Sequence, residues 1–273
     1  MLYFSEMMSL QHIPIHPALK GYVEKVWIFR SSEKIADEDM KLVVPNGLPK
    51  LVVPFCNGLS GTMPGWKHMS KENSITLIGI CDVPSIVDVQ DDAESGTIGV
   101  EFTPMGISRF FNIRQADIHN RIYALIDVVG KKALEIEEQI TDEPSPEKKA
   151  ILLQHYLLKI FNNGRDPIFE YCVSRIRSSK GMVQIKHLER ETGYSSRWLT
   201  AKFDEKLGIS PKNLCSVVRF HTAYQAFSFN QPIDVYGLYY DQSHFIREFK
   251  RFTGMPPGKF EKQVNDFDKI FYR

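Results

Sequence analysis

Residues 241–254 read DQSHFIREFKRFTG and decide how the C-terminal part of the chain folds. Asp241 can cap a helix, because its carboxylate accepts hydrogen bonds from the free amides of the first turn. Phe245, Phe249 and Phe252 then fall at i, i+4 and i+7 on one apolar face. Gly254 permits the left-handed conformation that ends a helix, and the two prolines beyond it prevent the helix from resuming. The stretch therefore predicts an amphipathic helix with polar and basic side chains on its open face.

A second stretch upstream repeats this pattern. Residues 193–203 read GYSSRWLTAKF, in which an aromatic residue precedes the capping Ser195 and apolar residues follow at helical spacing. A short helix over residues 185–192, ended by glycine, gives the spacing of a helix–turn–helix unit. Between the two stretches, Ser210 and Pro211 are a cap and a first-turn proline that open a long helix. Two helix–turn–helix units joined by one rigid helix are predicted.

The stretch from about Asp166 to Phe260 resembles the AraC-type DNA-binding domain, which has this arrangement. The matching positions run through both units: Leu188, Gly193-Tyr194-Ser195, Leu199, Phe203, Gly208-Ile209-Ser210-Pro211, Arg219, Ala223, Tyr239, Asp241-Gln242-Ser243-His244-Phe245, Phe249-Lys250, Gly254 and Pro257. The resemblance implies a bacterial transcription regulator, not an enzyme, that binds double-stranded DNA. It also implies that the second helix of each unit enters one of two successive major grooves.

The resemblance and the helix geometry together assign the residues that would contact DNA. Base-reading side chains are expected at Arg197, Thr200, Ala201, Gln242, Ser243 and Arg247. Phosphate contacts, which position a protein without specifying sequence, are expected from Ser196, Lys202, His244, Lys250 and Arg251. Ala201 can offer only an apolar contact to a thymine methyl group. For any single basic residue, the alternative to a DNA contact is an ordinary surface charge that is solvated by water.

One segment departs from the family pattern. Residues 232–238 read PIDVYGL and are about three residues short, close to one helical turn, where the family has a helix before the second recognition helix. Leu238 stands where glycine is usual, and Gly237 lies one position early. We expect a truncated supporting helix in the second unit. The alternative function is therefore a helical protein-interaction module with degraded DNA binding.

The charge distribution separates the C-terminal third from the rest of the chain. Residues 165–263 carry 16 Lys and Arg against 10 Asp and Glu, whereas the whole chain has a net charge of only +1. Residues 1–164 must then be acidic, because residues 264–273 carry two charges of each sign. A basic module in a nearly neutral protein is expected of a domain that binds a polyanion.

The N-terminal part has the composition of a β domain. Its β-branched runs are punctuated by Gly, Pro and Asn: KLVVPNG (41–47), KLVVPF (50–55), SITLIGI (74–80) and GTIGVEF (96–102). Short strands at this spacing favour a small barrel or sandwich. Asn46-Gly47 and Asn57-Gly58 predict hairpin turns. The predicted fold class is α+β, with an N-terminal small β-barrel or sandwich plus helices and a C-terminal all-α double helix–turn–helix domain.

These patterns predict four segments along the chain. A sensor or dimerisation domain spans residues 1–140, and a linker with a connecting helix spans 141–164. The DNA-binding domain spans 165–263, and a tail follows over 264–273. The connecting helix predicts a homodimer seam or packing on the DNA-binding domain, and burial against the barrel of the same chain is the alternative. The residues concerned are Ile151, Leu152, His155, Leu158 and Ile160.

The order of the two domains resembles the sensor-plus-reader layout of AraC-type regulators. It implies a small-molecule effector, for which no binding residue is assigned, and makes RNA polymerase a further candidate partner. Five aromatic residues of the N-terminal part either line an effector pocket or belong to the core: Tyr22, Trp27, Phe55, Trp66 and Phe102.

Catalytic, metal and cofactor sites are not predicted. Cys56, Cys81, Cys172 and Cys215 are scattered without a CxxC motif, and no secretory signal or transmembrane run is present. Reduced thiols in a cytoplasmic protein without a membrane partner are expected. The histidines have no acidic or cysteine neighbours at a metal-ligand spacing. A cupin-like metal enzyme in the barrel is the remaining enzymatic alternative.

Overall fold

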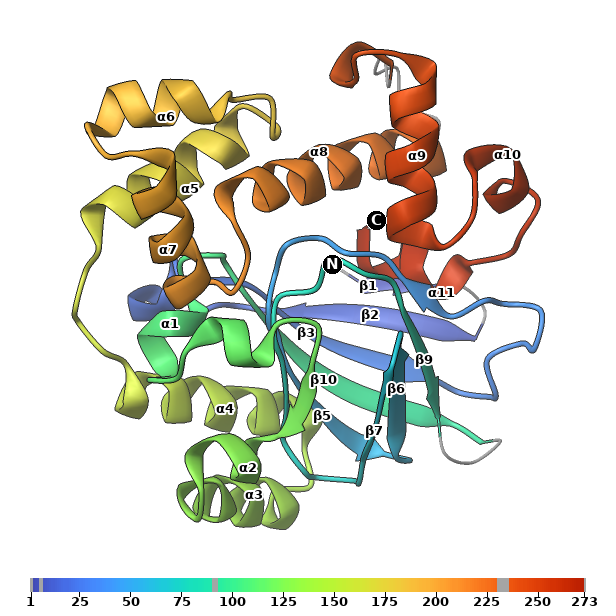
Figure 1. The fold of residues 1–273 in the computed structure, drawn as a ribbon. Helices are drawn as coiled ribbons and strands as arrows, with labels where there is room; N and C mark the ends of the chain where they lie inside the picture. Colours follow the sequence, from blue (N-terminus) through green and yellow to red (C-terminus); the bar gives the residue numbers. More distant parts are fainter. Residues whose placement is uncertain (1, 5–6, 90–92, 230–235, 273) are drawn as a thin grey trace.

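The computed structural model describes residues 2–4, 7–89, 93–229 and 236–272 (Figure 1). The N-terminal part contains two antiparallel sheets. The larger sheet has the order β1 (Leu2–Phe4), β2 (Met8–Ile13), β3 (Val23–Ser31), β10 (Ser95–Phe102), β5 (Lys50–Cys56), β8 (Thr76–Ile78) and β11 (Ile122–Ala124). The smaller sheet has the order β4 (Leu42–Val43), β9 (Ser85–Val89), β6 (Leu59–Met63) and β7 (Trp66–Ser70). This architecture confirms the α+β prediction.

The two sheets face each other across a common apolar interior, and we refer to them together as the barrel. Trp27, Phe29 and Val52 of the larger sheet share a hydrophobic cluster with Leu59 and Val87 of the smaller one. The central strand β10 is buried along its whole length. In β10, Gly99 is required because a side chain there would collide with the ring of Trp27.

Helices cover the outer side of the larger sheet. These elements are η1 (Pro17–Leu19), α1 (Ile107–Phe110), η2 (Gln115–Ile118), α2 (Leu125–Val129), α3 (Lys132–Asp142) and α4 (Pro146–Ile160). Ala150, Leu153 and Leu157 of α4 are fully buried in the same cluster as Ile98 and Val100 of β10. These buried residues of α4 pack against the barrel of the same chain, which was the alternative to a dimer seam or a contact with the DNA-binding domain.

The hairpin turns predicted for the N-terminal part are wrong. Asn46-Gly47 and Asn57-Gly58 do not join hairpins, because each lies between a strand of the smaller sheet and a strand of the larger one. In the predicted linker and connecting helix, residues 143–145 separate α3 from α4. Helix α3 continues to Asp142, and Ser145 caps α4 by accepting a hydrogen bond from the Lys148 amide. The chain crosses to the C-terminal helices after α4, where buried Arg109 donates to the Gly164 carbonyl over 2.7 Å.

The C-terminal part is helical, as predicted. It contains α5 (Pro167–Ser178), α6 (Ile185–Thr192), α7 (Ser196–Lys206), α8 (Pro211–Ser228), η3 (Tyr236–Leu238), α9 (Gln242–Thr253) and α10 (Pro257–Phe260). The chain ends with α11 (Asp266–Lys269) and η4 (Ile270–Tyr272). Residues 230–235, which hold most of the segment expected to be short, lie outside the described residues, and the described remainder is the single 3-10 turn η3.

Both helical units bury side chains of the N-terminal part in their cores. Ile80 belongs to the cluster of the first unit, with Leu199 and Phe203 of α7. Leu42 and Val44 belong to the cluster of the second unit, which is built on the phenylalanines of α9. The two parts of the chain are therefore packed against each other through apolar as well as polar contacts.

Asp82 is the centre of the polar contacts between the two parts. Its carboxylate accepts hydrogen bonds from Asn120 in the N-terminal part, from Asn213 in α8 and from Arg251 in the last turn of α9, over 2.7, 2.5 and 2.9 Å. His119 Nε2 lies 2.9 Å from the same carboxylate. Burial by itself would raise the pKa of Asp82, but hydrogen bonds from His119, Asn120 and Asn213 hold this pKa well below its ordinary value. Asp82 is therefore ionised and ties α8 and α9 to the barrel.

Replacement of this carboxylate should loosen the contact between the two parts. We expect Asp82→Ala to reduce the free energy of unfolding by roughly 1–3 kcal/mol, because buried polar partners lose their acceptor. Amide hydrogen exchange in α9 should also become faster. The control is Asp37→Ala, which removes only an exposed ion pair with Lys34 and should leave unfolding unchanged. Equal thermal unfolding of the two variants would show that Asp82 does not hold the parts together.

Candidate nucleic-acid interface

Helix α7 is positioned by a tight turn that follows α6. Gly193 ends α6 in the left-handed conformation, with φ at 76°. Ser195 then caps α7, its hydroxyl accepting from the Trp198 amide over 3.3 Å. Leu199 and Phe203 are fully buried against α5 and α8, whereas Trp198 is half-buried and stacks on Tyr194. This packing leaves the opposite face of α7 exposed, as expected for a recognition helix.

Helix α9 has the predicted cap, apolar face and end. Asp241 accepts from the His244 amide over 2.7 Å, and Gly254 ends the helix with φ at 83°. Phe245, Phe249 and Phe252 are buried, and the ring of Phe252 stacks on that of Phe220 in α8, with 4.6 Å between the centroids. The phenylalanine face therefore fixes α9 on α8, and the polar face points away from this contact.

A buried ion pair also connects α8 and α9. Arg219 of α8 donates to Glu248 of α9 over 3.0 Å, and both side chains are mostly buried. The guanidinium of Arg219 also lies over the ring of Tyr239, 5.2 Å from its centroid. Arg219, matched above to the family pattern, thus contributes to the orientation of α9.

Helices α7 and α9 lie at opposite ends of α8 (Figure 1). The first turns of both helices point away from the barrel, and their last turns point toward it. A pair of parallel helices held by a rigid connector is the geometry needed to reach two grooves on one side of a duplex.

All side chains predicted to read bases are exposed on these two helices. They are Arg197, Thr200 and Ala201 of α7 and Gln242, Ser243 and Arg247 of α9. Among the described residues, neither Arg197 nor Arg247 has an ion-pair partner, so both guanidinium groups are available to a ligand. The structure places the six residues in two groups, one on each helix.

The residues predicted to contact phosphate fall into two groups, those that are exposed and those that are paired with a carboxylate of the protein. Ser196 and Lys250 are exposed. Lys202 instead lies 3.1 Å from Asp166, and His244 lies 3.9 Å from Glu248. Arg251 is bound to Asp82 of the N-terminal part. Three of the five predicted phosphate contacts are therefore engaged within the protein in this arrangement.

Two exposed residues near the start of α9 were missed by the sequence argument. Ile246 is 38% exposed although it directly follows a buried phenylalanine, and Ser243, one turn before it, and Arg247, next to it, are exposed as well. Tyr240, just before the cap of α9, is 94% exposed. The signal for Ile246 was available, because position 246 lies off the 245, 249 and 252 face of the predicted helix.

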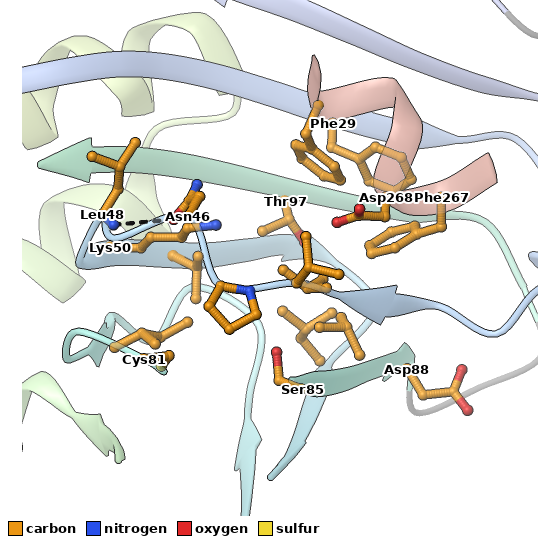
Figure 2. A pocket seen from close by; sticks show the side chains of 18 of the residues that line it. Phe29, Asn46, Leu48, Lys50, Cys81, Ser85, Asp88, Thr97, Phe267 and Asp268 are labelled. Atoms are coloured by element: carbon orange, nitrogen blue, oxygen red, sulfur yellow. Dashed lines mark hydrogen bonds between the residues drawn. The ribbon is translucent and has the colours of Figure 1, made fainter. Parts of the chain in front are cut away.

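The barrel contains a cavity of about 110 Å³, part of whose lining comes from the end of the chain. Figure 2 shows Phe29, Thr97 and Lys50 of the barrel around this cavity together with Phe267 and Asp268 of α11. Among the five aromatic residues considered as pocket residues, only Trp27 lines the cavity. Tyr22, Phe55 and Phe102 belong to or pack against the cluster beneath α4, and Trp66 donates to the Ile122 carbonyl.

Neither a metal centre nor a membrane span is found within the described part of the chain. No group of three or more His, Cys, Asp or Glu side chains there could hold a metal ion. None of the described helices is long and apolar enough to cross a membrane.

Comparisons with known proteins match both parts of the chain. A family model described as a helix–turn–helix domain matches residues 188–263, and one described as a domain of unknown function (DUF6597) matches residues 11–124. No curated protein sequence matches the chain.

Several solved structures are similar to the chain at low sequence identity. ToxT from Vibrio cholerae with bound unsaturated fatty acid is 11% identical, with 90% of this chain and 97% of that chain covered and a TM-score of 0.46. A second ToxT structure is 12% identical, with 88% and 97% covered and a TM-score of 0.45. Bacterial pirin YhhW from Escherichia coli in complex with nickel(II) is 6% identical, with 37% and 47% covered and a TM-score of 0.31. Because these TM-scores are below 0.5, no function is inferred from them.

The two helix–turn–helix units and the family match over residues 188–263 agree with the sequence pattern quoted above. Residues 188–263 therefore belong to a helix–turn–helix domain of the AraC type, and a β-barrel domain precedes it in the chain.

Proposed function

We propose that the protein binds a bipartite DNA site by placing α7 and α9 in two successive major grooves. The observation that carries this proposal is the pair of exposed helix faces at opposite ends of α8, with first turns that point the same way (Figure 1). Base contacts come from Arg197, Thr200 and Ala201 in one groove and from Gln242, Ser243 and Arg247 in the other. Ile246 adds an apolar contact, suited to a thymine methyl group.

Phosphate binding involves two groups of residues in this proposal. Ser196 and Lys250 contact the backbone directly, because both are exposed. Lys202, His244 and Arg251 contribute after their internal carboxylate partners exchange for phosphate. For Arg251 this exchange requires separation from Asp82, so DNA binding and the contact between the two parts of the chain compete. An effector that changes this contact would then regulate DNA binding, and the barrel cavity is its proposed site.

The two arginines should determine sequence preference at separate positions. We expect Arg197→Ala and Arg247→Ala each to weaken binding by about 1–3 kcal/mol and to relax the preference at one position, most simply a guanine. The measurement is selection of bound sequences from a random duplex pool, followed by affinity measurement on the selected site. Lys262→Ala, an exposed cation outside α7 and α9, is the matched control and should retain the full preference. Unchanged sequence selectivity in both arginine variants would refute these base contacts, and a half-length site would refute insertion of both helices.

Lys250 should behave differently from the arginines, because a phosphate contact carries no sequence information. We expect Lys250→Ala to weaken binding to all sequences alike and to reduce the slope of log affinity against log salt by about one. Affinities measured at several salt concentrations test this expectation. A loss confined to one sequence would instead assign Lys250 to a base.

We also propose a homodimer, which would place two DNA-binding domains on repeated sites and raise affinity through bivalency. Although most of α4 packs on its own barrel, Ile151 remains 45% exposed and His155 lies on the same open face. We expect the full chain to sediment as a dimer at tens of micromolar, about the range of a weak dimer. Ile151→Glu should give a monomer, whereas Lys262→Glu, an exposed position outside α4, should not. A strictly monomeric wild type contradicts the proposal.

A further inference from the structure

Residues 264–272 follow the DNA-binding domain in sequence but return to the barrel in space (Figure 1). The Asn265 side chain exchanges two hydrogen bonds of 2.9 Å with the backbone of Leu42. Asp39 accepts from the Phe267 amide over 2.9 Å, and Lys25 donates to the Phe271 carbonyl over 3.1 Å. We call residues 264–272 the C-terminal segment. It is held at the barrel by several bonds that span almost the whole length of the chain.

Aromatic side chains of the C-terminal segment form one wall of the barrel cavity. Phe267 lies edge-on to Phe29, with 5.4 Å between the ring centroids, and Phe271 lies edge-on to Trp27 at 4.9 Å. All four residues line the cavity. A molecule in this cavity would therefore contact both the barrel and the end of the chain.

The same segment is also bonded to the helix that joins the two DNA-binding units. Tyr224 of α8 donates to one oxygen of Asp268 over 2.7 Å, and both side chains are fully buried. The ring of Tyr272 lies edge-on to His221 of α8, with 4.8 Å between centroids. The segment thus connects the cavity with α8, and through α8 with α7 and α9.

Asp268 is buried, and only one of its two carboxyl oxygens accepts a hydrogen bond from the described residues. Its Oδ1 has no hydrogen-bond partner among the described residues, although a buried acceptor without a partner is costly. Burial raises the pKa of Asp268 to about 7, and the hydrogen bond from Tyr224 opposes only part of this shift. In Figure 2 the carboxyl group points into the cavity, toward the side of Thr97. A ligand that donates a hydrogen bond would satisfy this oxygen.

Other polar groups in the lining favour a neutral ligand over an anion. Lys50 lies 3.3 Å from Glu101, and Asp88 at the edge lies 2.9 Å from Lys41, so each of these charges is already compensated. Two further lining atoms lack partners among the described residues, the Trp27 Nε1 donor and the Ser95 hydroxyl. A hydroxyl group is both donor and acceptor, and it therefore suits Asp268 together with either of these groups.

We propose that this cavity binds a small, mainly apolar alcohol or phenol whose hydroxyl group donates to Asp268, and that the C-terminal segment transmits its binding to α8. The proposal deepens the effector control proposed above and rests on it. The apolar ring or chain fills the space between Trp27, Phe29, Phe267 and Phe271. Because Asp268 holds both the ligand and Tyr224, any adjustment of its carboxyl group reaches α8 directly.

The ligand class is tested on the full-length protein by calorimetry with three probes of one shape: 2-naphthol, its methyl ether and 2-naphthoate. We expect 2-naphthol to bind about tenfold more tightly than the ether, the effect typical of one satisfied hydrogen bond. Its affinity should also be at least tenfold higher than that of 2-naphthoate. Asp268→Asn keeps an acceptor and should preserve the preference for the hydroxyl, whereas Asp268→Leu should abolish it. Asp37→Asn, an exposed position outside the cavity lining, is the control and should behave as wild type.

Several results would overturn this assignment. Equal or tighter binding of 2-naphthoate would show an anion site, and a preference for the hydroxyl that persists in Asp268→Leu would remove Asp268 from the contact. Failure of all three probes to bind wild type would show that the cavity is only core space. If Asp268→Leu does not fold, which circular dichroism reports, the comparison of probes on wild type and Asp268→Asn still decides the ligand class.

Transmission is tested separately, on DNA. Saturating 2-naphthol should change the affinity of wild type for its selected DNA site by at least about threefold. The methyl ether should produce a smaller change in this affinity. Tyr224→Phe should keep 2-naphthol binding but lose this effect. Binding of 2-naphthol without any change in DNA affinity would refute transmission through the segment. If wild type binds 2-naphthol but does not bind any DNA sequence specifically, the proposed function is refuted, whereas the cavity assignment is not.

Discussion

Burial of the C-terminal segment in the barrel is the contact on which the arrangement of the two domains depends. Phe267, Ile270 and Phe271 complete the apolar interior around Trp27 and Phe29. These residues lie beyond the DNA-binding units in sequence, so their burial draws α8 and α9 against the N-terminal part. The chain is thereby fixed at two places, at the crossing after α4 and at its end. Both helical units are consequently held in one orientation relative to the barrel.

This orientation has a direct electrostatic consequence for DNA binding. The faces of α7 and α9 that carry the proposed base-reading residues are exposed, but part of the cationic surface is compensated inside the protein. A phosphate must replace a carboxylate at Arg251 and Lys202 before these residues add to affinity. Exchange of one anionic partner for another involves small net free energies, because both partners are desolvated to a similar extent. An equilibrium of this kind is sensitive to modest changes at the domain contact.

The cavity and the Asp82 cluster contact different parts of the DNA-binding domain. Asp82 holds the last turn of α9 and the first turn of α8, whereas the C-terminal segment holds the second half of α8. Together they constrain α8 at both ends. A change at either end therefore alters the position of the helix that sets the spacing between α7 and α9. In the proposed function, this is how the N-terminal domain changes DNA affinity without contacting DNA.

The sequence by itself determined the local structure of the C-terminal helices and which side chains they expose. The cap at Asp241, the phenylalanine face and the glycine end of α9 are interactions within about one turn, so residue spacing predicts them. The β-rich barrel was also predicted from its strand pattern. The hairpins predicted at Asn46-Gly47 and Asn57-Gly58 were wrong, because a turn dipeptide does not specify which sheet the next strand joins. Only the tertiary structure decided the partners of Arg251, Lys202 and Asp268, since each pairing joins residues distant in sequence. The role of the C-terminal segment was also decided only by the tertiary structure. Its aromatic residues are evident in the sequence, but their burial depends on where the barrel lies in space.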